Sequence, residues 1–152
     1  MITYFDYATL PVTPWKNGAG ATREIIAVPS VDAPFLWRAS IATLQADGPF
    51  SPFPGVDRTI VLLAGRPLRL RGEENRTIRL ALWQPWAFPG EWELSSVGIV
   101  EPGLDFNVMT QRGRASAKVE VVSDRQRAAT EASLMCCRGS GIWPGGAAPP
   151  QR

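Results

Sequence analysis

Short extended segments separated by glycine and proline are the feature that most constrains the fold of this chain. Its 152 residues include 14 glycines and 14 prolines, and segments with helical spacing are scarce. Many short strands divided by such turn residues are typical of a β-sandwich or barrel. We therefore predict an all-β fold. The predicted strands are residues 2–7, 22–28, 36–44, 58–64, 68–71, 77–83, 92–99, 105–111 and 117–123.

Residues 15–24 carry an unusual density of polar side chains around glycines. They read Trp-Lys-Asn-Gly-Ala-Gly-Ala-Thr-Arg-Glu. Glycine lets backbone amides approach a bound group closely. The planar guanidinium of Arg23 can bind a carboxylate through two parallel hydrogen bonds, and the ammonium group of Lys16 is a compact positive charge. A loop that leads into a strand with solvated charges explains the same residues, so both interpretations remain open at this stage.

Strand alternation places further polar residues together. Successive side chains of a strand point to opposite faces. Arg38 and Ser40 therefore share one face of the strand over residues 36–44. Asp105 and Asn107 share one face of the strand over residues 105–111. If these faces point inward they line a pocket, and if they point outward they are solvated surface.

A stiff, proline-rich loop precedes a charged pair. Residues 47–55 read Asp-Gly-Pro-Phe-Ser-Pro-Phe-Pro-Gly, and Asp57 and Arg58 follow at the start of an apolar strand. Burying a charged group without a partner costs free energy. The two residues therefore need partners. Mutual pairing, pairing with Arg38 or Arg23, and contact with a ligand are the alternatives.

Four sequence blocks in this order resemble the HutD/Ves family of cupin-like proteins. They are Trp-Lys-Asn-Gly at 15–18, Phe-Leu-Trp-Arg-Ala-Ser-Ile-Ala at 35–42, Asp-Gly-Pro-Phe-Ser-Pro-Phe-Pro-Gly-Val-Asp-Arg at 47–58, and Asp-Phe-Asn-Val-Met at 105–109. The resemblance runs from about residue 7 to residue 114. It implies a cupin-like, RmlC-type β-barrel or jelly roll.

The resemblance also implies a function. The family is associated with bacterial histidine utilisation and is thought to bind a small acidic metabolite, such as formylglutamate, rather than to catalyse a step. We expect a non-catalytic binding protein without a cofactor. A metal-independent hydrolase, lyase or isomerase acting on a small carboxylate, or a truncated non-functional copy, are the alternatives. The expected ligand-binding residues are Trp15, Lys16, Asn17, Arg23, Arg38, Ser40, Asp57, Arg58 and Asn107.

The chain departs from the family pattern in two places. Ala19 stands where the motif has its middle glycine. After the Asp-Phe-Asn block, the usual C-terminal strands are replaced by a segment that ends rich in glycine, proline and alanine. We expect a cupin-like domain over residues 1–122 and a divergent tail over residues 123–152, helical and then disordered. An incomplete barrel exposes a sheet edge, which predicts a homodimer.

Composition excludes several function classes. A net charge of +2 gives no general attraction to nucleic acid or membrane. Histidine is absent, so histidine-dependent triads, histidine general bases and multi-histidine metal sites are excluded. No metal is expected.

The sequence also predicts a cytoplasmic protein. It contains no apolar run of about 18 residues and no basic, apolar leader at its start. Its only cysteines, Cys136 and Cys137, are adjacent, and adjacent cysteines form no ordinary loop-closing disulfide.

Overall fold

A computed structural model describes residues 5–122 of the chain. Residues 10–120 form one compact unit, and the described residues 5–9 and 121–122 belong to a second. In the second unit, Tyr7–Thr9 is a 3-10 turn. The predicted strand over residues 2–7 is wrong for its described part, because the Asp6 carbonyl and carboxylate accept the amides of Thr9 and Ala8 at 3.0 and 3.2 Å and bend the chain.

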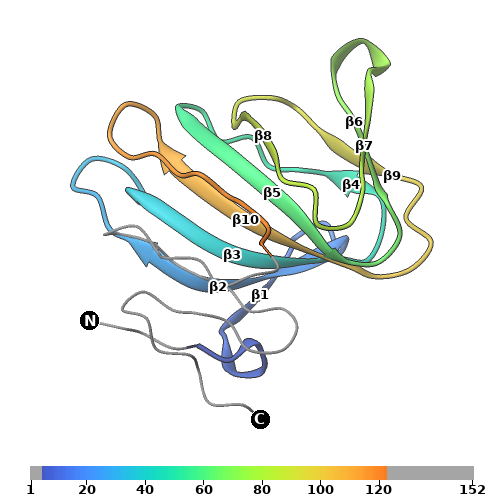
Figure 1. Ribbon diagram of the computed structural model, residues 1–152, viewed down its shortest axis with the longest axis horizontal. Coiled ribbons are helices and arrows are strands. Elements are labelled where there is room, and N and C mark those ends of the chain that lie inside the picture. The colour runs from blue at the N-terminus through green and yellow to red at the C-terminus, as the bar shows by residue number, and fades with distance from the viewer. Residues whose placement is uncertain (1–4, 123–152) are drawn as a thin grey trace. The chain divides into compact units, whose positions relative to one another are not determined.

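The larger unit consists of two antiparallel sheets (Figure 1). The six-stranded sheet has the order β1-β2-β3-β10-β5-β8. Its strands are β1 (Val12–Pro14), β2 (Gly20–Val28), β3 (Trp37–Leu44), β10 (Gly103–Gln111), β5 (Val56–Ala64) and β8 (Trp86–Pro89). The long late strand β10 lies between β3 and β5 and is antiparallel to both.

The four-stranded sheet has the order β4-β9-β6-β7. Its strands are β4 (Gly48–Pro49), β9 (Ser95–Val97), β6 (Leu68–Arg71) and β7 (Thr77–Leu80). A 3-10 turn, η2 (Glu73–Asn75), connects β6 to β7. Leu68 and Leu70 of β6 are buried, whereas Arg69 and Arg71 are exposed, so this sheet has one apolar and one solvated face.

The apolar faces of the two sheets meet in one hydrophobic core. Its buried members are Leu44, Ile60, Leu62, Leu68, Leu70, Leu80, Phe88 and Leu94. Burying each such side chain contributes about 1.5–3 kcal/mol relative to leaving it exposed. The face of the six-stranded sheet that carries Leu44, Ile60 and Leu62 is called the inner face below, and the opposite face the outer face.

The all-β prediction is confirmed, with differences in the strands. Predicted strand 68–71 matches β6, and 22–28, 36–44, 58–64 and 105–111 differ from β2, β3, β5 and β10 by one or two residues at an end. Predicted strands 77–83 and 92–99 are shorter in the structure, and residues 117–122 hold no strand. Strands β1, β4 and β8 were not predicted, since they are short and rich in proline.

Within residues 10–120 the two sheets do not close into a barrel, in line with the incomplete barrel that the sequence predicts, and β1, β8, β4 and β7 lie at their edges. The predicted helical and disordered tail lies outside the described residues. Within residues 5–122, no helix has the length and apolar character needed to cross a membrane.

Candidate functional site

The glycine-rich motif forms the tight turn between β1 and β2. Trp15 and Gly20 close it through a backbone hydrogen bond of 2.9 Å, and Gly18 takes the positive φ of 71° that the turn requires. The side chain of Asn17 accepts a hydrogen bond from the amide of Ala19 at 2.9 Å. Ala19 has no positive φ, so its methyl group causes no backbone strain at this motif position.

Trp15 links this turn to the inner face. Its indole Nε1 donates a hydrogen bond of 2.7 Å to Thr22 Oγ1, and its ring packs against the hydrophobic core. Gly20 leaves no room for a larger side chain, since an added Cβ would lie 2.1 Å from the carbonyl oxygen of Thr43 and 3.0 Å from the Trp15 ring. The glycine therefore allows Trp15 to lie close against β3.

Polar residues from four adjacent strands share the inner face. Asn107 of β10 pairs with Ser40 of β3 and with Ile60 of β5. Met109 pairs with Arg38 on one side and Arg58 on the other. Residues directly opposite in a sheet point to the same face. We call this group the inner-face cluster: Glu24, Arg38, Ser40, Arg58, Asp105 and Asn107.

Asn107 is hydrogen-bonded to both charged residues at the buried end of the cluster. Its Oδ1 accepts a hydrogen bond from Arg58 Nη2 at 3.2 Å, and its Nδ2 donates to Asp105 Oδ1. Arg58 and Asn107 are each 6% exposed, and Asp105 is 1% exposed. The three side chains form a buried, hydrogen-bonded row in which the Asn107 amide lies between the Arg58 guanidinium and the Asp105 carboxyl group.

Aromatic rings surround the Arg58 guanidinium. Its Cζ lies 5.9, 5.2 and 5.0 Å from the ring centroids of Phe50, Phe53 and Phe88. Arg58 Nη1 also donates to the carbonyl of Ser51 at 3.3 Å. Burial lowers the pKa of Arg58 to about 10, although the negative charge of Asp105 favours the charged form. Arg58 is therefore a fixed positive charge near neutral pH.

Asp105 is the buried acid of the cluster. Burial raises its pKa to about 7, while the charge of Arg58 and the hydrogen bond from Asn107 act in the opposite direction. A buried carboxyl that titrates near neutrality beside a specific charge partner is typical of functional sites.

The opposite end of the cluster reaches solvent. Arg38 Nε lies 3.2 Å from Glu24 Oε1, and the two side chains are 23% and 48% exposed. The Nε atoms of Arg38 and Arg58 are nevertheless buried, and neither makes a hydrogen bond with an acceptor in the described part of the chain. A buried donor without an acceptor costs about 1–3 kcal/mol, so the cluster is suited to an added anion.

Five of the nine predicted binding residues lie on the inner face. Four of them belong to the cluster: Arg38, Ser40, Arg58 and Asn107. The fifth, Trp15, is hydrogen-bonded to Thr22, which lies on the same face. The other four lie elsewhere. Lys16 is exposed at the turn, and Asn17 is committed to the turn's hydrogen bond.

Arg23 and Asp57 do not join the cluster because strand alternation turns them to the outer face. Arg23 pairs with Ile41, one position from the inner-face pair Thr22 and Ala42. Asp57 is 56% exposed and forms an ion pair of 2.8 Å with Arg112. Arg112 also pairs with Glu91 at 2.6 Å.

Asp105 and Glu24 are members of the cluster that the predicted binding set omitted. The shared face of Asp105 and Asn107 is visible in the sequence alternation and could have identified Asp105. The sequence could not have identified Glu24 in the same way. Its pairing with Ser40 depends on the register of β2 against β3, which includes an irregularity between Glu24 and Ile26.

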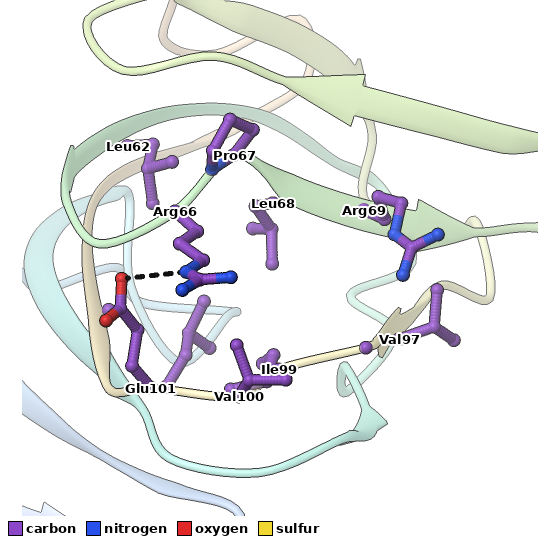
Figure 2. A pocket seen from close by; sticks show the side chains of 12 residues that line it. Leu62, Arg66, Pro67, Leu68, Arg69, Val97, Ile99, Val100 and Glu101 are labelled. Atoms are coloured by element: carbon purple, nitrogen blue, oxygen red, sulfur yellow. Dashed lines mark ion pairs between the residues drawn. The ribbon is translucent and has the colours of Figure 1, made fainter.

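Two hollows are lined mostly by residues outside the cluster. Figure 2 shows one of about 30 Å³, in which Arg66 points between Pro67 and Val100 and forms an ion pair of 3.5 Å with Glu101. This volume suits a water molecule rather than a metabolite. The other, of about 360 Å³, is lined mainly by outward-facing residues of β5, β8 and β10, and Arg58 is the cluster residue at its border.

Within residues 5–122, no group of three or more histidine, cysteine, aspartate or glutamate side chains is arranged to hold a metal ion. The chemistry that the cluster offers is therefore that of guanidinium, amide, hydroxyl and carboxyl groups.

Two antiparallel sheets around a shared core, with a polar cluster on an inner face, define a cupin-like protein. A cupin 2 conserved barrel domain protein from Salinispora arenicola CNS-205 is similar in fold, with a TM-score of 0.51, 13% identity, and coverage of 75% of this chain and 91% of that one. The chain belongs to the HutD family, whose model matches residues 7–142. The predicted family and the cupin-like fold are confirmed.

Two relatives are similar in sequence as well. Protein Ves from Citrobacter koseri is 44% identical over 119 residues, which are 78% of this chain and 62% of the relative. The structure of HutD from Pseudomonas fluorescens SBW25, in a formate condition, has a TM-score of 0.70 and 33% identity, covering 74% of this chain and 61% of that one. The chain thus spans less than two thirds of the length of either relative.

Proposed function

We propose that the inner-face cluster binds a small carboxylate-bearing metabolite and does not catalyse its conversion. The observation that carries this proposal is the buried Nε–H groups of Arg38 and Arg58, neither of which makes a hydrogen bond among the described residues, although Arg38 Nε is ion-paired with Glu24 at 3.2 Å. Guanidinium groups bind carboxylates through short, charge-assisted hydrogen bonds. Ser40 and Asn107 add groups that recognise an amide or formyl oxygen.

The family points to the ligand class. HutD proteins are associated with histidine utilisation, and the family resemblance implies an acidic intermediate such as formylglutamate. Such a molecule carries two carboxylates and a formyl group on a short carbon chain. It matches two arginines, a hydroxyl and an amide beside the Trp15 ring, the usual form of a small-molecule site. We place the protein in the cytoplasm as a modulator of that pathway.

Arg38→Ala is expected to weaken binding of N-formyl-L-glutamate by at least tenfold. The substitution removes charge-assisted hydrogen bonds of about 1.5–3 kcal/mol each, and 1.4 kcal/mol corresponds to tenfold in Kd. Isothermal titration calorimetry at pH 6.5 measures the effect. Arg69→Ala is the matched control, since Arg69 is exposed on the solvated face of the four-stranded sheet. Equal affinities for the two variants would place the site elsewhere.

A metal-independent enzyme is the second candidate, and Asp105 is the observation that favours it. A carboxyl whose pKa is raised to about 7 can act as a general acid or base near neutral pH. Incubating the protein with N-formyl-L-glutamate and following formate release by NMR separates the two functions. The binding function predicts that no formate is released, and release of several formate molecules per protein would establish catalysis.

A further inference from the structure

We propose that binding of an anionic ligand at the inner-face cluster is coupled to uptake of one proton by Asp105. This inference rests on the proposed function, because it concerns the same site. It makes Asp105 the residue that sets the charge of the site and thereby its preference for anions, without requiring Asp105 to touch the ligand.

Asp105 is connected through Asn107 to Arg58, the arginine that would hold the ligand. Asn107 donates to Asp105 with its Nδ2 and accepts from Arg58 with its Oδ1. Arg58 is thus the positive charge that stabilises ionised Asp105. A ligand carboxylate bound at Arg58 would use the same positive charge, so the two anions would compete for it.

The charges of the cluster balance before a ligand binds. Its charged groups are Arg38 and Arg58, Glu24 and Asp105, which cancel when all four are ionised. Each ligand carboxylate that enters the site then adds one uncompensated negative charge, so uptake of one proton removes part of the excess. When two carboxylates share one site, the pKa of one of them rises strongly.

The surroundings of Asp105 identify it as the group that takes the proton. The charged residues that face the site are Glu24 from β2, Arg38 from β3 and Arg58 from β5. Strand β8 contributes only Trp86 and Phe88 to this face. The core residues from β6 and β7 are apolar: Leu68, Leu70, Leu80 and the half-buried Ile78.

The Glu24 side chain is 48% exposed and ion-paired with Arg38 at 3.2 Å. Asp105 is 1% exposed, and burial already raises its pKa to about 7. A ligand carboxylate with an ordinary pKa near 4 stays ionised at neutral pH. The proton therefore comes from the buffer and adds to Asp105.

Calorimetric titration of the wild-type protein with N-formyl-L-glutamate, in two buffers of different ionisation enthalpy, counts the protons taken up. At pH 8 we expect uptake approaching one proton per ligand bound, and at pH 5.5 uptake near zero. Affinity should be constant at acid pH and should fall by up to tenfold per pH unit above about pH 7, where the free protein's Asp105 loses its proton.

Asp105→Asn should abolish both the proton uptake and the pH dependence of affinity. Asp32→Asn is the matched control, since Asp32 is an exposed, ion-paired aspartate outside the cluster, and it should behave as wild type. If Asp105→Asn does not fold, the wild-type titration at pH 8 decides alone. Binding at pH 8 with no proton uptake would overturn this inference and leave the proposed function intact, whereas absence of binding at every pH would overturn both.

Discussion

Arg58→Ala is expected to lower the free energy of unfolding at pH 8 by about 3–5 kcal/mol, because removing this buried positive charge leaves ionised Asp105, which is linked to it through Asn107, uncompensated. Asp105 is 1% exposed and would lose the guanidinium that stabilises its ionised form. Asn107 Oδ1 would lose its donor. The substitution also leaves a void among Phe50, Phe53 and Phe88. Urea denaturation followed by tryptophan fluorescence measures the change.

Two further variants test the cause of this loss. Arg69→Ala should change stability by less than about 0.5 kcal/mol, as expected for an exposed side chain. Adding Asp105→Asn to Arg58→Ala should recover part of the loss at pH 8, since the uncompensated charge is then absent and the two residues are coupled. A loss below about 1 kcal/mol for Arg58→Ala, or strict additivity in the double variant, would contradict the buried charge pairing.

Wild-type stability is expected to fall between pH 5 and pH 8 by about 2.7 kcal/mol, which is about 1.4 kcal/mol for each of the two pH units between pH 5 and the pKa of Asp105 in the folded protein, about 7. Its pKa is 3.8 in the reference state and about 7 in the folded protein. Between these values the folded state holds a proton that the unfolded state has released. Raising the pH therefore favours unfolding until Asp105 is ionised in both states.

Among the described groups whose pKa is shifted, Asp105 is the one that titrates within this pH window. The pKa values of Asp32, Asp47 and Glu91 are lowered by hydrogen bonds and ion pairs, so they titrate on the acid side of the window, and Arg58 titrates near pH 10. Asp105→Asn should flatten the stability curve from pH 5 to pH 8. A wild-type curve that rises or stays level over this range, or an unchanged slope in Asp105→Asn, would show that Asp105 is not buried as an acid.

Strand alternation predicted which residues of the site share a face, but not which face of the sheet is the inner one. It placed Arg38 with Ser40 and Asp105 with Asn107, as the register of β3 and β10 confirms. It could not identify the inner face, because β3 buries residues on both faces, including Ala39 and Ser40. The same alternation separates Asp57 from Arg58, so two neighbouring residues of β5 could not both line one pocket.

Long-range packing accounts for the features that the sequence did not predict. The rings around Arg58 come from two different segments, the loop with Phe50 and Phe53 and the strand with Phe88. The lack of acceptors for the two arginine Nε–H groups depends on this packing. Strand β8 pairs with β5 although prolines lie in and beside it, which is possible because it is an edge strand.

We expect the Nε–H groups of Arg38 and Arg58 to bind the ligand carboxylate. NMR spectra of the arginine Nε–H groups, recorded at pH 6 while N-formyl-L-glutamate is added, test it most directly. We expect the Arg38 and Arg58 resonances to shift with one common saturation curve, as both donors gain an acceptor, while the exposed Arg69 resonance stays unchanged. Saturating ligand that leaves the Arg38 and Arg58 resonances in place, or that shifts only arginines outside the inner-face cluster, would contradict the claim.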